Sequence, residues 1–216
     1  MSQTSLAAEL VERGADAARR RSAAEIDRLL GAAEAALTKG GYAGLRVDDV
    51  LAEAGLSTRA FYRRFRGKSE LFLALFDREA VRAGERLRAV LARADDAEAR
   101  VRAWIEATLA LAYDARLARR TRLFLVERHV LTTEFPELVA RCVRALLEPL
   151  EDAIAAGRDE GIFPGADPVA DALAIHHLCA GLTSDRLLGT SNRSRANAVA
   201  LAERFALTTL TGGSSS

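Results

Sequence analysis

Cysteine, lysine and proline are scarce in this chain, and no long apolar run opens it. Cys142 and Cys179 are the only cysteines among 216 residues, and they lie far apart within apolar stretches. Neither a disulfide framework nor a zinc knuckle is therefore expected. The first 25 residues carry charges every few positions, unlike a signal peptide or a membrane span. We expect a cytoplasmic protein that does not bind a membrane, with both thiols buried and reduced.

Motifs for catalysis or cofactor binding are also missing. No glycine-rich phosphate loop follows a strand, no Glu-x-x-His ligand set occurs, and no nucleophile has a plausible base beside it in the sequence. The adjacent His176 and His177 would point about 100° apart on a helix, so they cannot readily chelate one ion. We therefore expect no enzyme, no cofactor and no metal.

The residues that are abundant indicate an all-α fold. Ala, Leu, Arg and Glu dominate, and alternating runs of β-branched residues are missing. A first strong helix is expected over residues 23–39, with one apolar face and an end at Gly40 and Gly41. Further helices are expected over residues 47–54, 57–65 and 68–92. Later breaks are expected at residues 95–96, 114–118, 132–133, 161–167 and 189–192. Pro149 should kink or end its helix, and Asp167 followed by Pro168 should begin one.

Four parts are expected along the chain: a flexible arm (1–22), a small helical domain (23–67), a larger helical domain (68–211) and a flexible tail (212–216). The arm includes the basic run Arg19, Arg20 and Arg21. Two interpretations of this run stay open. It is either a solvated, frayed tail or an arm that reaches DNA phosphates or a minor groove.

Positive charge is concentrated near the N-terminus. The net charge is only +1, but residues 1–68 carry 12 basic against 9 acidic residues, a balance of +3. Within it, the stretch from Ser57 to Lys68 holds five basic residues and no acid. Lys39 and Lys68 are the only lysines, so arginine is the common basic residue throughout the chain, and its presence alone is weak evidence for a nucleic-acid partner. The position of the charge is what indicates a nucleic-acid partner.

The segment VDDVLAEAGLSTRAFYRRF has the pattern of a helix-turn-helix. Its first helix has an apolar stripe from Val47 to Ala54, Gly55 forms a sharp turn, and Phe61 and Phe65 lie four apart on the second helix. Such a second helix offers its N-terminal residues to a DNA major groove. Thr58 and Arg59 lie at that leading end, where they can bond to base edges.

The other outward side chains suit the same partner. Tyr62 and Arg63 lie one turn later, while Arg64, Arg66 and Lys68 are placed for phosphates. The helix starts at Val47 and Lys68 could also bind phosphates through free N–H groups.

The run GYAGLRVDDVLAEAGLSTRAFYRRFRGKSELFLALFD resembles the DNA-binding domain of TetR-type transcriptional regulators, and the match extends over about residues 23–77. The resemblance implies a three-helix DNA-binding domain followed by a helical bundle for ligand binding and dimerisation. It also implies a repressor that binds a double-stranded operator, with Lys68 on a phosphate. The operator contacts implied are Ser57, Thr58, Arg59, Tyr62 and Arg63. Two positions depart from the family: Arg46 replaces the usual Thr or Ser cap, and Arg64 stands where His is common.

The last two long helices, expected over residues 167–188 and 193–210, resemble the family's dimerisation helices. A homodimer with a near-palindromic operator is expected, because one helix-turn-helix usually needs two half-sites. The expected interface consists of Ala170, Ala174, His177, Gly181, Val199, Leu201 and Phe205.

Between the two ends, the few aromatic residues gather with some polar ones, as in a ligand cavity. The predicted ligand-binding residues are Trp104, Thr108, Leu111, Phe124, Arg128, His129, Cys142 and His177. The expected effector is a small hydrophobic or amphipathic molecule. Ordinary core packing is the alternative for each of these residues, and a helical ligand-binding or interaction protein without operator-specific DNA binding is the alternative function.

Overall fold

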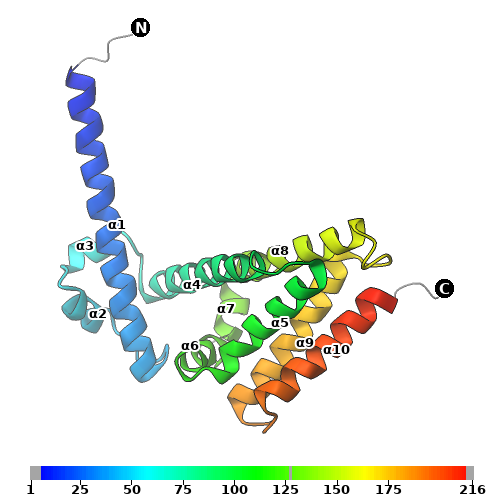
Figure 1. Ribbon diagram of the computed structural model, residues 1–216. Helices are drawn as coiled ribbons and strands as arrows, with labels where there is room; N and C mark the ends of the chain where they lie inside the picture. Colours follow the sequence, from blue (N-terminus) through cyan, green and yellow to red (C-terminus); the bar gives the residue numbers. More distant parts are fainter. Residues whose placement is uncertain (1–5, 127, 213–216) are drawn as a thin grey trace. The chain divides into compact units, whose positions relative to one another are not determined.

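The computed structural model describes the backbone of residues 6–126 and 128–212, and the side chains of residues 11–126 and 131–212. These residues form ten α-helices and no strand, so the all-α fold class is confirmed (Figure 1). None of these helices is long and apolar enough to cross a lipid bilayer. The helices are α1 (Leu6–Gly40), α2 (Val47–Ala54), α3 (Thr58–Tyr62), α4 (Lys68–Leu91), α5 (Ala97–Tyr113), α6 (Ala115–Val126), α7 (Arg128–Glu134), α8 (Pro136–Asp159), α9 (Pro168–Leu188) and α10 (Arg195–Gly212).

The chain divides into two compact units between Leu75 and Phe76. The sequence had suggested a division after residue 67, where α4 begins. The difference arises because the first turns of α4 belong to the core of the first unit. Leu71, Phe72 and Leu75 are buried, and the Phe72 ring lies 4.9 Å from the ring of Tyr42.

Helix α1 is longer than expected. It begins at Leu6 rather than near Ala23, so the part predicted as an arm is helical from Leu6 onward, and residues 1–5 lie outside the described residues. The predicted apolar face is confirmed from Leu29 on, where Leu29, Ala33 and Leu37 are buried. Its end is also as predicted, because Gly41 follows in the left-handed conformation with φ of 62°.

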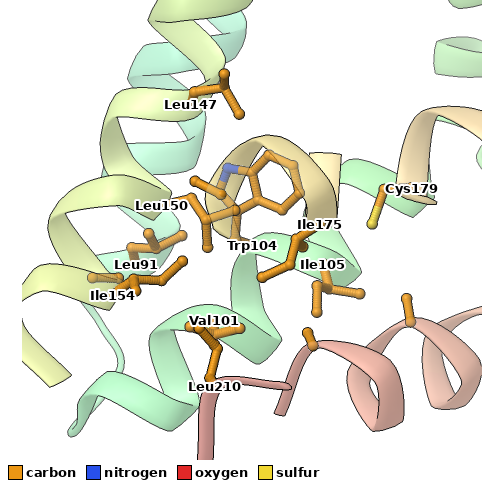
Figure 2. Packing of buried hydrophobic residues seen from close by; sticks show 14 of the residues in the cluster. Leu91, Val101, Trp104, Ile105, Leu147, Leu150, Ile154, Ile175, Cys179 and Leu210 are labelled. Carbon is orange, nitrogen blue, oxygen red and sulfur yellow. The ribbon is translucent and has the colours of Figure 1, made fainter. Parts of the chain in front are cut away.

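The core of the second unit is built around Trp104 of α5. Its indole is fully buried, and the indole N–H donates to the carbonyl of Leu146, 3.0 Å away. Figure 2 shows leucine and isoleucine side chains of α8 on one side of the ring and Ile175 of α9 on the other. Burying the N–H without a partner would cost free energy, so this bond fixes how α5 meets α8.

The boundaries of the later helices agree with the sequence at most breaks. Asp167 caps α9, and its carboxylate accepts from the N–H groups of Val169 and Ala170, each at 3.1 Å. The break predicted at Thr132 and Thr133 is wrong, because both residues lie within α7. The chain breaks at Phe135 instead, since the next residue is a proline that suits the first position of α8.

Pro149 lies inside α8 and does not end it. Proline lacks an N–H, so the carbonyl of Ala145 loses its usual partner within the helix. That carbonyl faces Gly84 of α4, where an added Cβ would lie 2.7 Å from its oxygen. At the C-terminus, Gly212 ends α10, and the rest of the predicted tail lies outside the described residues.

Both cysteines are free and buried, as predicted. Burial, with a smaller contribution from the nearby Asp77 carboxylate, raises the pKa of the Cys142 thiol from 9.0 to about 11. Burial raises the pKa of the Cys179 thiol to about 12. Both thiol pKa values are higher in the folded than in the unfolded protein. The two thiols therefore contribute their full stabilisation below about pH 9, and this stabilisation is lost as the pH rises through 11 to 12.

We therefore expect slow alkylation of the native protein. When a thiol pKa rises from 9.0 to about 11, the thiolate fraction at pH 8 falls about 100-fold. At pH 8, iodoacetamide should label both cysteines about 100-fold more slowly in the native protein than in protein unfolded in about 6 M urea, as measured by mass spectrometry. Rapid labelling of either thiol in the native protein would contradict this burial.

Candidate functional site

The turn between α2 and α3 is built from local sequence. Gly55 ends α2 with φ of 62° and ψ of 40°, a conformation that glycine adopts without steric cost. Ser57 then begins α3, and its hydroxyl oxygen accepts from the N–H of Ala60 at 3.2 Å. Phe61 and Phe65 point inward and are buried. The glycine turn, the serine cap and the two aromatic anchors therefore hold α3 on the surface of the first unit.

The outward face of α3 carries the side chains predicted to contact DNA. Thr58, Arg59 and Tyr62 are all exposed, and 59% of Tyr62 is accessible. Within the described residues, Arg59 forms no ion pair. Exposure of a large aromatic ring is costly in water, and the Tyr62 ring stands perpendicular to the ring of Phe61, with centroids 5.2 Å apart. This face is therefore available to a partner.

The basic charge after α3 is partly balanced by an acid from α1. The Glu25 carboxylate, only 13% exposed, lies 3.6 Å from the guanidinium of Arg63 and 3.3 Å from that of Arg64. The sequence had shown no acid between Ser57 and Lys68, and α1 supplies one from elsewhere. Arg63 keeps 56% of its side chain exposed, whereas Arg64 keeps 28%.

Two further predicted contacts lie at helix starts. Arg46 precedes α2 in an extended conformation and makes no side-chain cap, as its departure from Thr or Ser had suggested. Lys68 begins α4, and its ammonium lies 4.7 Å from the centre of the Tyr42 ring. The Tyr42 hydroxyl shares a 2.8 Å hydrogen bond with Ser69. Val47 and Lys68 are half-buried, while Arg46 and Ser57 are exposed.

The second unit contains an apolar pocket of about 230 Å³ between α4, α5, α6, α8 and α9. Three of the predicted ligand residues line it, namely Trp104, Thr108 and Leu111. The Thr108 hydroxyl oxygen is buried without a hydrogen-bond partner in the described part of the chain. Other lining residues are Ala83, Arg86, Leu87, Val90, Ala107, Ala110, Leu117, Leu146 and His176.

The remaining predicted ligand residues lie elsewhere. Phe124 packs against Phe76, with ring centroids 5.2 Å apart, and Cys142 is buried in α8 outside the pocket lining. His177 is exposed, and its neighbour His176 lines the pocket instead, because one residue along a helix turns the side chain by about 100°. The side chains of Arg128 and His129 lie outside the described residues.

The sequence reasoning missed the contribution of α4 to this pocket. Ala83, Leu87 and Val90 lie at spacings of four and three, which places them on one face of the helix. This periodicity is visible in the sequence, but the prediction of the ligand site was based on aromatic residues, and this face of α4 has none.

The residues predicted for a dimer interface form a partly exposed surface on α9 and α10. Ala170, Ala174, His177 and Gly181 are exposed along α9. On α10, Phe205 is 55% exposed, while Val199 and Leu201 are half-buried. Val169 and Leu173, which were not predicted, add exposed apolar area at 54% and 39%. Between the two helices lies a shallow hollow of about 220 Å³, which Ala174 and Phe205 help to line.

Residues 29–75 match the family model of bacterial regulatory proteins, tetR family. The matched segment runs from the buried Leu29 of α1 to the buried Leu75 at the end of the first unit. It therefore covers the helix-turn-helix described above. A comparison with curated proteins finds no match.

Solved structures share the fold over most of the chain. The regulator FadR from Bacillus subtilis, solved with stearoyl-CoA, is 20% identical with a TM-score of 0.66, covering 87% of this chain and 98% of its own. A TetR-family transcriptional regulator from Mesorhizobium loti is 20% identical with a TM-score of 0.69, covering 89% and 97%. A transcriptional regulator from Saccharomonospora viridis, solved with choline, is 22% identical with a TM-score of 0.69, covering 83% and 94%.

At 20–22% identity the solved structures establish the fold. The family match establishes the type of the helix-turn-helix. The expectation of a regulator agrees with the family match over residues 29–75. Residues 29–75 therefore carry a helix-turn-helix unit of the tetR family type, within a fold that solved transcriptional regulators share.

Proposed function

We propose that this protein is a ligand-responsive transcriptional repressor that binds a near-palindromic operator as a homodimer and is released by a small, largely apolar effector. The observation that carries the proposal is the outward face of α3. Thr58, Arg59 and Tyr62 are exposed there, on a helix held by two buried phenylalanines. Repression is the usual mode of the family that the helix-turn-helix resembles.

The chemistry of this face suits the edges of base pairs in a major groove. An arginine guanidinium can donate two hydrogen bonds to one guanine, and a threonine can bond to a base or pack on a thymine methyl. Arg59 has its guanidinium available for this, because no carboxylate among the described residues holds it. Arg63 has to exchange part of its contact with Glu25 for a phosphate or base. We therefore assign the specific contacts to Thr58, Arg59 and Tyr62, with Arg46, Arg63, Arg64 and Lys68 as backbone contacts.

A second copy of the chain is the proposed occupant of the α9 and α10 surface. Small exposed residues at Ala170, Ala174 and Gly181 let a partner helix approach closely, and Phe205 supplies a large apolar side chain beside them. Burying such a surface is favourable by about 25 cal/mol for each Å² of apolar area. A two-fold pair of helix-turn-helix units also matches the symmetry of a near-palindromic operator.

The effector is proposed to bind the pocket beside Trp104. A cavity of about 150 Å³ with apolar walls holds a molecule as large as benzene, and this pocket measures about 230 Å³. Its polar groups are few: the hydroxyl of Thr108, the imidazole of His176 and, at the exposed rim, Arg86. We therefore propose a compact apolar molecule with one hydrogen-bonding group directed at Thr108. Relatives of the same fold hold ligands as different as stearoyl-CoA and choline, so the pocket lining rather than the fold sets the ligand.

Helix α4 is the proposed link between effector and DNA. Its later turns line the pocket through Ala83, Leu87 and Val90, whereas Leu71 and Phe72 in its first turns are buried in the unit that carries the helix-turn-helix. An effector that prefers one position of α4 changes the population of DNA-binding dimers by its difference in affinity.

The experiment that tests the proposal uses the whole protein and the DNA upstream of its own gene. Fluorescence anisotropy should show sequence-selective binding, two chains per operator, and an affinity that falls steeply as salt rises. A helical ligand-binding protein without operator binding would instead show no preference for this DNA over a scrambled duplex. That result would overturn the proposal.

The effector site makes a separate prediction at Thr108. Replacing Thr108 by valine keeps the shape and removes a buried hydroxyl without a partner, so the free energy of unfolding should rise by about 1 kcal/mol. The same change should weaken the effector about 2- to 12-fold, the equivalent of one lost neutral hydrogen bond.

A thermal-shift screen of small aromatic and aliphatic alcohols, amides and acids first identifies a ligand that releases the operator. Release is then titrated for Thr108→Val, with Thr108→Ser as the matched control that keeps the hydroxyl. Equal effector affinity in the wild type and in Thr108→Val would remove Thr108 from the site.

A further inference from the structure

Helix α1 extends well beyond the core of the first unit. At 1.5 Å per residue, its 35 residues span about 52 Å. Among its described side chains, burial begins at Leu29, and none from residue 11 to residue 28 is buried. In Figure 1 the N-terminal part of the helix runs past α2 and α3. A helix that protrudes in this way gains little from core packing, so its outward side chains are free to meet a partner.

The protruding part carries the run Arg19, Arg20 and Arg21, all three exposed. Arg19 pairs with Asp16 at 3.1 Å, with 78% and 46% of the two side chains exposed. Such exposed pairs contribute little and are screened by salt, so the pair does not withhold Arg19 from a stronger anion. Consecutive residues on a helix point about 100° apart, so the three guanidiniums cover much of the circumference.

The position of this run relative to α3 is fixed by Glu25. Its carboxylate contacts Arg63 and Arg64 directly after α3, so α1 passes beside the end of the recognition helix. Arg21 precedes Glu25 by four residues and Arg19 by six, which is about 6 to 9 Å along the helix axis. Arg19 precedes Ile26 by seven residues, about two turns, so both lie on the same side of α1.

We propose that Arg19, Arg20 and Arg21 bind the phosphate backbone of DNA that flanks the base pairs contacted by α3. The proposal rests on the proposed operator binding and adds a contact that the helix-turn-helix alone does not make. Phosphates are the favoured partner because arginine forks match their oxygens, and because DNA docked on α3 continues beside the adjacent turns of α1. The extension would then increase affinity without changing which bases are preferred.

The test compares the wild type with the triple variant Arg19→Gln, Arg20→Gln, Arg21→Gln on two operator duplexes. One duplex ends at the outer edges of the half-sites, and the other adds about one helical turn of unrelated sequence on each side. Glutamine has nearly the helix propensity of arginine, so α1 keeps its structure, which circular dichroism verifies. The control variant removes three exposed arginines from the second unit, through Arg93→Gln, Arg193→Gln and Arg195→Gln.

On the longer duplex we expect the triple variant to bind at least tenfold more weakly and with a shallower salt dependence. Each lost phosphate contact reduces the slope of log K against log salt by about 0.9, so three arginines on each of two subunits reduce it by up to about 5. On the shorter duplex the triple variant and the wild type should agree, and the control should match the wild type on both.

Two results would overturn the inference while leaving operator binding intact. Equal affinity and slope for the wild type and the triple variant on the longer duplex would show that the run does not contact DNA. Equal loss on both duplexes would show that the arginines act within the operator rather than beside it. If the wild type binds neither duplex, the proposed function fails, and this inference fails with it.

Discussion

Arg59→Ala is expected to weaken operator binding by about 30-fold to about 10⁴-fold, while the protein stays folded. A bidentate contact between arginine and guanine contributes about 1–3 kcal/mol of discrimination, and a dimer uses it in each half-site. The Arg59 side chain is exposed and supports no other part of the first unit, so its removal should leave the thermal unfolding midpoint nearly unchanged. Anisotropy against the upstream duplex measures the first effect, and circular dichroism the second.

The same experiment assigns the role of Tyr62. Tyr62→Ala should lose binding to a similar extent, since the ring is 59% exposed on the outward face of α3. Tyr62→Phe separates the two ends of the side chain: if the ring packs on the DNA, this variant keeps most of the affinity, and if the hydroxyl bonds to it, the variant resembles alanine.

Arg93→Ala is the matched control, because it removes one exposed arginine from the second unit. It should bind the operator as the wild type does. Unchanged binding by both Arg59→Ala and Tyr62→Ala would mean that α3 is not the element that contacts the bases.

The helix-turn-helix could be predicted from the sequence because its determinants are local. Gly55, Ser57, Phe61 and Phe65 lie within eleven consecutive positions, and each acts through its own turn or helix face. Backbone conformation, capping and the direction of side chains on a helix all depend on neighbours a few residues apart. The predicted inward and outward faces of α3 are therefore confirmed.

The ion pairs of Glu25 show where such reasoning ends. Glu25 lies 38 residues before Arg63 in the chain, and only the packing of α1 places its carboxylate there. The charge balance of residues 57–68, taken alone, overstates how much positive charge is free. Within residues 57–68, the exposed cations that form no ion pair among the described residues are Arg59 and Arg66.

The long α1 illustrates a different limit. Residues 1–22, which include the basic run Arg19, Arg20 and Arg21, were predicted as a flexible arm, and burial is what usually stabilises a helix. Ala, Arg, Glu and Leu nevertheless have high intrinsic helix propensity, and continuing an existing helix needs no new nucleus. The helix therefore extends to Leu6 without a core to support it.

The lining of the ligand pocket could be predicted only in part, because it depends on contacts between helices that no local sequence pattern contains. The grouping of aromatic and polar residues correctly included Trp104, Thr108 and Leu111, which line the pocket from α5, whereas Phe124 and Cys142 belong to other surroundings. Choosing between His176 and His177 required the rotation of α9 about its own axis, which only the packed structure provides.

Gly157→Ala is expected to lower the free energy of unfolding by about 1–3 kcal/mol, the usual cost of overpacking a core. Gly157 lies in α8, where its carbonyl accepts from the N–H groups of Ile162 and Phe163 at 2.8 and 3.0 Å. This arrangement folds the fully buried ring of Phe163 back onto the glycine. An added Cβ would collide with that ring and lie 2.9 Å from the Cβ of Ala97.

Gly31→Ala is the matched control, because Gly31 is also inside a helix but is exposed and has open space around it. Alanine has the higher helix propensity, so this variant should gain about 1 kcal/mol, and the same gain opposes the clash at position 157. The two substitutions should thus shift the urea midpoint in opposite directions with the m-value unchanged. A Gly157→Ala protein as stable as Gly31→Ala would mean that Phe163 and Ala97 do not pack closely on α8 at this point.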